Sequence, residues 1–121
     1  MSWNNIRMEL GIVPQFPQGS PHRYYLLRIP LKTGCHIDED AVRASPKRAT
    51  VRRFWPSQAD LRGYVVKTSK GWAFSYDPTR RDDESIFDMG TGPIRVGECI
   101  TLTEPDGERL PFSVTSVQPL D

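Results

Sequence analysis

The sequence contains little cysteine or histidine and no long apolar run. Its 121 residues include 2 cysteines and 2 histidines. Cys35 and Cys99 are widely separated and form no Cys-x-x-Cys pair, which excludes a disulfide-dense secreted scaffold. No stretch approaches the roughly 20 apolar residues of a transmembrane helix, and residues 1–10 lack the apolar segment of a signal peptide. We therefore expect a cytoplasmic protein with two reduced thiols and no membrane partner.

The familiar patterns of catalytic and metal sites are also missing. No Gly-x-Ser-x-Gly motif, phosphate-binding loop or dinucleotide fingerprint appears. The conceivable zinc ligands are Cys35, His36, Asp38 and Cys99. They lack the paired short spacings typical of zinc sites, and the acidic side chains of 77–88 do not match an EF-hand calcium loop. We therefore expect no metal, no cofactor and no catalytic residue, and we favour a protein that is not an enzyme.

Short apolar runs separated by turn residues dominate what is present. The chain holds 11 prolines and 9 glycines, and its turn signals recur roughly every 8–12 residues, as in small barrels and sandwiches. Extended runs are expected at residues 6–13, 23–29, 49–55, 63–68, 72–76, 99–103 and 110–117, and residues 86–89 are a candidate for a further short strand. One short helix is expected near residues 37–44, with Asp38, Glu39 and Asp40 in its first turn.

Together these patterns predict an all-β or β-dominated fold. The expected architecture is a small, partly closed antiparallel barrel of about seven short strands with that one helix. A chain of this length fits one domain, so residues 1–121 are predicted to form a single barrel-like domain.

Charge is distributed unevenly along the chain although the net charge is only +1. Residues 43–81 carry ten basic and two acidic side chains, whereas residues 82–121 carry two basic and nine acidic ones. The basic segment is also rich in aromatic residues. A positive groove with stacking aromatics is how small barrels hold single-stranded nucleic acid. Binding of RNA or DNA through 43–81 is therefore one alternative function, with candidate contacts Arg52, Arg53, Arg62, Lys67, Lys70, Trp55 and Trp72.

The same basic segment has a simpler interpretation. Large aromatic side chains in a small domain mostly pack inward, and the acidic last third can pair with the basic middle, either within the fold or between proteins. Our first hypothesis is therefore a non-catalytic binding or interaction module whose partner is a protein or a nucleic acid. Arg52 and Arg53 are adjacent, so one of them faces inward in a regular strand. Either a bulge or a carboxylate partner must resolve this, and Asp82, Asp83 and Glu84 are the candidate partners.

A C-terminal stretch resembles the flavin-binding barrel of ferredoxin-reductase-type enzymes. The similarity lies in residues 95–102 followed by 109–113. That family holds its flavin with Arg-x-Tyr-Ser on one strand, whereas here an extra residue separates Arg109 from Phe112 and phenylalanine replaces tyrosine. The resemblance implies a flavin-binding barrel or another small enzyme as a second alternative. These departures from the motif, and the small part of the chain involved, lead us to expect no flavin.

Overall fold

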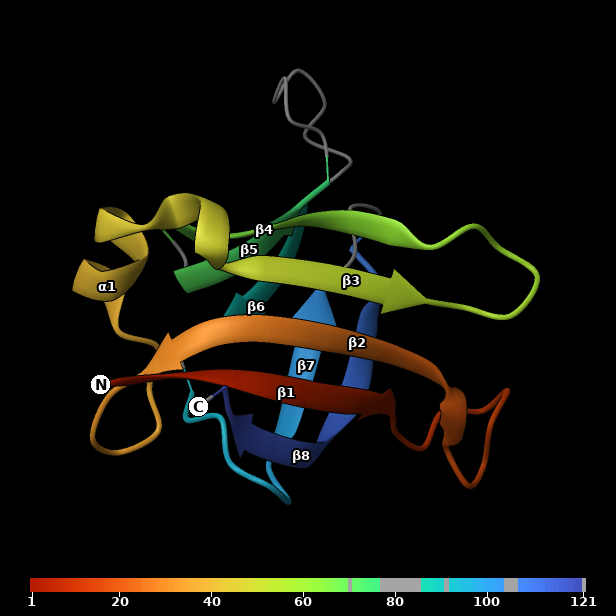
Figure 1. The fold of residues 1–121 in the computed structure, drawn as a ribbon. Helices are drawn as coiled ribbons and strands as arrows, with labels where there is room; N and C mark the ends of the chain where they lie inside the picture. Colours follow the sequence, from red (N-terminus) through yellow and green to blue (C-terminus); the bar gives the residue numbers. More distant parts are fainter. Residues whose placement is uncertain (70, 77–85, 91, 104–106, 121) are drawn as a thin grey trace.

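The computed structural model describes residues 1–69, 71–76, 86–90, 92–103 and 107–120. In these residues eight antiparallel strands close into a barrel, and one short α-helix packs beside it (Figure 1). The elements are β1 (Ser2–Leu10), β2 (Ser20–Leu31), α1 (Glu39–Ala44), the 3-10 helix η1 (Pro46–Arg48), β3 (Thr50–Phe54), β4 (Leu61–Thr68), β5 (Gly71–Ser75), β6 (Ile86–Gly90), β7 (Cys99–Thr103) and β8 (Arg109–Pro119). The predicted β-dominated barrel is confirmed, with one strand more than expected.

Each strand pairs with the next one along the chain, and β8 returns to pair with β1. Pairing is extensive between β1 and β2, which form nine residue pairs with a register shift between Glu9 and Leu10. Between β6 and β7, the described residues contribute the single pair Asp88 and Thr103. The ring of strands is therefore closed, but it is thin at this seam. The two chain ends lie side by side, since the backbone N–H of Leu120 donates to the carbonyl oxygen of Trp3 at 3.0 Å.

The barrel interior is built by strands whose side chains alternate between the two faces of the sheet. The most deeply buried large side chains include Tyr25, Phe74, Phe112, Ile6, Met8, Leu27 and Ile29. The Tyr25 ring lies 5.2 Å from Phe74 and 5.0 Å from Phe112 between centroids. Such aromatic contacts add to the free energy of burying their area. The apolar interior is filled by its own side chains, so polar functional groups lie on the outer face and at the barrel ends.

The predicted helix near residues 37–44 is confirmed as α1 beside one end of the barrel. The Asp38 carboxylate accepts a hydrogen bond from the backbone N–H of Ala41 at 3.1 Å. Asp38 is therefore the N-cap, because its oxygen satisfies an otherwise unpaired N–H. The sequence placed Asp38 in the first turn, one position too far into the helix. Val42 is buried against the barrel. No described helix reaches the roughly 20 residues of a membrane crossing, α1 having 6.

Candidate anion-binding interface

The candidate site begins with the alternation of β3. Val51 is fully buried in the barrel. Its neighbours in the strand, Thr50 and Arg52, therefore project from the outer face. The inward position two residues further along is Arg53, which is half-buried. The adjacent arginines thus occupy opposite faces of one strand, as their spacing predicts.

Strand register brings further cations to the outer face beside Arg52. Arg52 lies directly opposite Arg62 of β4, and Thr50 lies between Arg28 of β2 and Tyr64 of β4. The three strands run side by side in Figure 1. Their outer side chains line a groove of about 330 Å³. We call it the arginine groove and define it by Arg28, Thr50, Arg52, Arg62 and Tyr64.

Gly63 forms the floor of the arginine groove, where β4 approaches β5 closely. A Cβ atom at this position would collide with the carbonyl oxygen of Ser75. Position 63 therefore requires glycine because there is no room for a Cβ atom. Its φ angle makes no such demand.

The arginine groove carries uncompensated positive charge within the described part of the chain. The ion pairs of the described residues are formed by Arg7, Arg43 and Arg95. None of these pairs includes Arg28, Arg52 or Arg62. Arg52 and Arg62 are both exposed. Like charges placed directly opposite one another across two strands are destabilising. An anion that bound between them would relieve this repulsion.

Aromatic rings extend the outer surface from the arginine groove towards β1. The Arg52 guanidinium lies 4.8 Å from the Phe54 ring centroid. Phe54 stacks on Tyr24 of β2 with 4.8 Å between centroids and 17° between planes. Both rings are half-buried. Rings of this kind add flat surface beside the cations.

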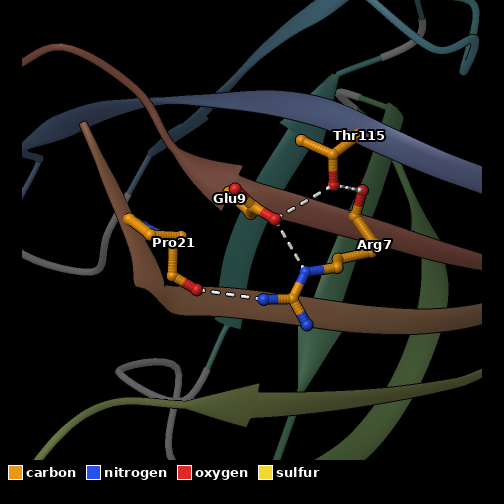
Figure 2. Close-up of polar contacts among 4 residues, drawn as sticks. All are labelled: Arg7, Glu9, Pro21 and Thr115. Carbon is orange, nitrogen blue, oxygen red and sulfur yellow. Dashed lines mark hydrogen bonds and ion pairs between the residues drawn. The ribbon is translucent and has the colours of Figure 1, made fainter. Parts of the chain in front are cut away.

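At the far end of this aromatic surface, Arg7 has partners that the groove arginines lack (Figure 2). Its Nε donates to Glu9 Oε2 at 2.8 Å, and its Nη2 donates to the Pro21 carbonyl oxygen at 3.0 Å. Its guanidinium also lies 3.7 Å from the centroid of the Tyr24 ring. The hydrogen bond with Glu9 raises the pKa of Arg7 above its ordinary value. Arg7 is therefore bound into the fold.

The structure places six of the seven predicted contacts, in three different surroundings. Arg52 and Arg62 meet in the arginine groove. Arg53 and Trp55 lie at one end of the barrel interior, where the Arg53 guanidinium is 4.0 Å from the Trp55 ring centroid. Lys70 lies outside the described residues.

The inward Arg53 has a neutral partner among the described residues. Its Nη1 donates to Gln58 Oε1 at 3.0 Å. The expected partners, Asp82, Asp83 and Glu84, lie outside the described residues. Trp55 packs against the core, with its centroid 6.3 Å from Tyr25 and 6.2 Å from Phe112. These two residues extend the barrel interior and do not join the groove.

Tyr76 is largely buried in the same region as Arg53. Burial raises the pKa of the Tyr76 phenol well above its ordinary value. The phenol therefore remains neutral at physiological pH, as expected of an acid whose charged form is poorly solvated.

Lys67 and Trp72 face one another across β4 and β5, beside the helix. The Lys67 Nζ lies 5.5 Å from the Trp72 ring centroid. The Trp72 side chain is mainly part of the core, with the residue 6% exposed. This pair belongs to a separate cleft and does not touch Arg52 or Arg62.

Besides Thr50, sequence reasoning missed two groove residues that carry charge or a ring, Arg28 and Tyr64. Each is flanked by buried or half-buried apolar residues, so alternation alone assigns both to the outer face. What the sequence does not show is that Thr50 stands between them. Strand register supplies that information.

The described residues hold no group of three histidine, cysteine, aspartate or glutamate side chains close enough to share a metal ion. Most of the acidic segment 77–88 lies outside this part of the chain. Both cysteines are free, with Cys99 exposed and Cys35 half-buried. The chemistry that the described surface offers is therefore cationic and aromatic.

No family model, curated protein or solved structure matches the chain.

Proposed function

We propose that this barrel is a non-catalytic binding module that holds a single-stranded nucleic acid on the arginine groove. The observation that carries the proposal is the cross-strand pair Arg52 and Arg62, with Arg28 nearby and no carboxylate partner in the described residues. Guanidinium groups bind phosphate oxygens through paired hydrogen bonds. Successive phosphates of one strand would neutralise the cluster.

The aromatic residues of the outer face favour nucleic acid over an acidic protein. Tyr64, at 36% exposure, forms one side of the arginine groove. Phe54 and Tyr24 continue the flat surface on the other side. Unpaired bases stack on such rings without regard to sequence, whereas the acidic side chains of a protein have no planar bases to place there. In this proposal Arg52 and Arg62 contact phosphates and Tyr64 contacts a base.

The proposal retains the broader expectation of a cytoplasmic module without a catalytic centre. The free thiols Cys35 and Cys99 agree with a reducing compartment. In that compartment, nucleic acid is the class of ligand best matched to an arginine cluster beside the exposed ring of Tyr64.

Fluorescence anisotropy with a labelled single-stranded RNA of about 16 nucleotides tests the proposal. If three guanidinium groups each neutralise one phosphate, the logarithm of the binding constant falls with a slope of about −2 against the logarithm of salt concentration. Affinity then drops about twentyfold between about 50 and 200 mM NaCl. The double variant Arg52→Gln and Arg62→Gln should weaken binding and make the slope shallower by about 1.4.

The matched control is Arg95→Gln, because Arg95 is exposed but pairs with Glu98 at 3.0 Å away from the groove. This variant should keep the wild-type affinity and salt slope. Absence of RNA binding at low salt would overturn the proposal. Equal competition by poly-glutamate would replace nucleic acid with an acidic protein partner.

A further inference from the structure

A second and larger cleft lies between the helical segment and the barrel wall. It occupies about 660 Å³ between α1 and η1 on one side and β4 and β5 on the other. We call it the helix-side cleft. Small-molecule sites typically have volumes of about 300–1,000 Å³ and mainly apolar walls. Its apolar lining includes Val42, Pro46, Val66 and Trp72.

Two lysines from different elements provide positive charge at the helix-side cleft. Lys47 belongs to η1 and Lys67 to β4, and both are exposed. No ion pair of the described residues involves either lysine. A third lining cation, Arg43, is already paired with Glu39 at 3.2 Å. The available charge is therefore that of the two ammonium groups.

The aromatic side chains further define what the cleft can accept. The Lys67 ammonium lies 5.5 Å from the Trp72 ring centroid, so this charge sits beside apolar surface. Tyr64 also lines the cleft and is 36% exposed. A ligand with its anionic group at Lys67 would place its adjoining rings among Val66, Trp72 and Tyr64. Flat rings pack well against such walls.

We propose that the helix-side cleft binds a small aromatic anion, meaning one or two fused or linked rings that carry a carboxylate or sulfonate. Lys47 and Lys67 pair with the anionic group, and the apolar residues of α1 and β4 contact the rings. This is a second binding activity whose test does not require nucleic-acid binding at the arginine groove, although Tyr64 borders both sites. The apolar body supplies most of the buried surface, while the charge selects anions over neutral molecules.

The probe is 8-anilinonaphthalene-1-sulfonate, whose fluorescence rises on transfer to an apolar site. N-phenyl-1-naphthylamine has the same rings without the sulfonate and serves as the neutral probe. We expect one saturable site for the sulfonate and roughly tenfold weaker binding of the neutral probe. A difference of this size is what two solvent-exposed ion pairs contribute to binding. The double variant Lys47→Gln and Lys67→Gln should remove this difference by weakening sulfonate binding alone.

Lys32→Gln is the matched control, because Lys32 is exposed and does not line the cleft. It should leave the binding of both probes unchanged. Circular dichroism confirms that each variant is folded. Val66→Trp, which places an indole where the ligand rings are expected to lie, should weaken the binding of both probes.

Competition separates aromatic from aliphatic ligands. 2-Naphthoate should displace the fluorescent sulfonate, and octanoate should do so much less effectively. Equal displacement by octanoate would overturn the aromatic assignment. Unchanged sulfonate binding in the double lysine variant or in Val66→Trp would overturn the site itself.

Discussion

Arg7 and Arg52 both project from the outer face of the barrel, but their surroundings differ. Arg7 donates to Glu9 and Pro21 and covers the ring of Tyr24. Arg52 faces another arginine, Arg62, across the neighbouring strand. The first arrangement satisfies the charge within the fold. The second leaves charge that no ion pair of the described residues neutralises.

The difference shows how one barrel surface can serve stability and binding separately. Around β1 and β8, side chains from several strands meet each other, and the Thr115 hydroxyl lies 3.3 Å from Glu9 Oε2 (Figure 2). Around β3 and β4, the outer side chains form a groove instead. We expect substitutions in the first region to lower stability and substitutions in the second to lower ligand affinity.

The largest change in stability should come from a substitution in the barrel interior, against which the strands of both outer regions pack. Phe74→Ala removes a fully buried ring next to Tyr25 and should lower the free energy of unfolding by about 3–5 kcal/mol. Urea denaturation measures this change. Gln118→Ala, at an exposed position, should remain within about 0.5 kcal/mol of the parent. A small effect of Phe74→Ala would mean that the two outer regions do not share one rigid support.

Removal of the satisfied charge should have a smaller but measurable effect. Arg7→Gln loses the ion pair with Glu9 and the contact over Tyr24, and the free energy of unfolding should fall by about 1 kcal/mol. RNA affinity should change less in this variant than in Arg52→Gln. If Arg7→Gln and Arg52→Gln lower the free energy of unfolding equally, the two regions do not differ in how they satisfy arginine charge.

Reversal of one groove charge should raise stability and abolish binding together. Arg62→Glu places a carboxylate directly opposite Arg52 in register, and a cross-strand pair of opposite charges should raise the free energy of unfolding by about 0.5 kcal/mol. RNA binding should disappear because the groove loses most of its positive charge and gains a carboxylate that repels phosphate. Thermal unfolding and anisotropy are measured on the same sample. Loss of stability would show that the two side chains do not interact across the strands.

The smallest effect is expected for neutralisation of Arg52 alone. Arg52→Gln relieves the repulsion with Arg62 but gives up the contact over Phe54. The free energy of unfolding should therefore be unchanged or rise by a few tenths of a kcal/mol, about the size of one exposed charge interaction. Added salt should reduce this difference. A clear loss of stability would mean that Arg52, like Arg7, is bound into the fold.

The fold was predictable because local patterns determine it. The alternation around Val51 and the proline and glycine turns indicate short strands, and the acidic residues before Val42 indicate the helix. The exact N-cap, Asp38, was missed by one position because boundary residues depend on which oxygen reaches a backbone N–H. Closure of the barrel through β1 and β8 joins opposite ends of the sequence, so no local pattern reveals it.

The candidate site was only partly predictable for the same reason. Composition indicated the basic segment, and Arg52 and Arg62 do meet in the groove. Their alignment with Arg28 and Tyr64 depends on register between strands that are distant in sequence. The position of the Trp72 side chain depends on how β5 packs against the rest of the barrel. Trp72 lies in the core and lines the helix-side cleft, not the arginine groove. Charge can be read from sequence, whereas juxtaposition requires the folded strands.

The meeting of the chain ends determines how the molecule responds to mechanical force. β1 and β8 are antiparallel, with Asn4 opposite Pro119 and Leu120 bonded to Trp3. A pull on both ends loads these hydrogen bonds one after another, starting at the terminal pair, in an unzipping geometry. Each bond resists alone, so the strands should peel apart at low force and uncover the apolar residues of β1 before any other seam is stretched.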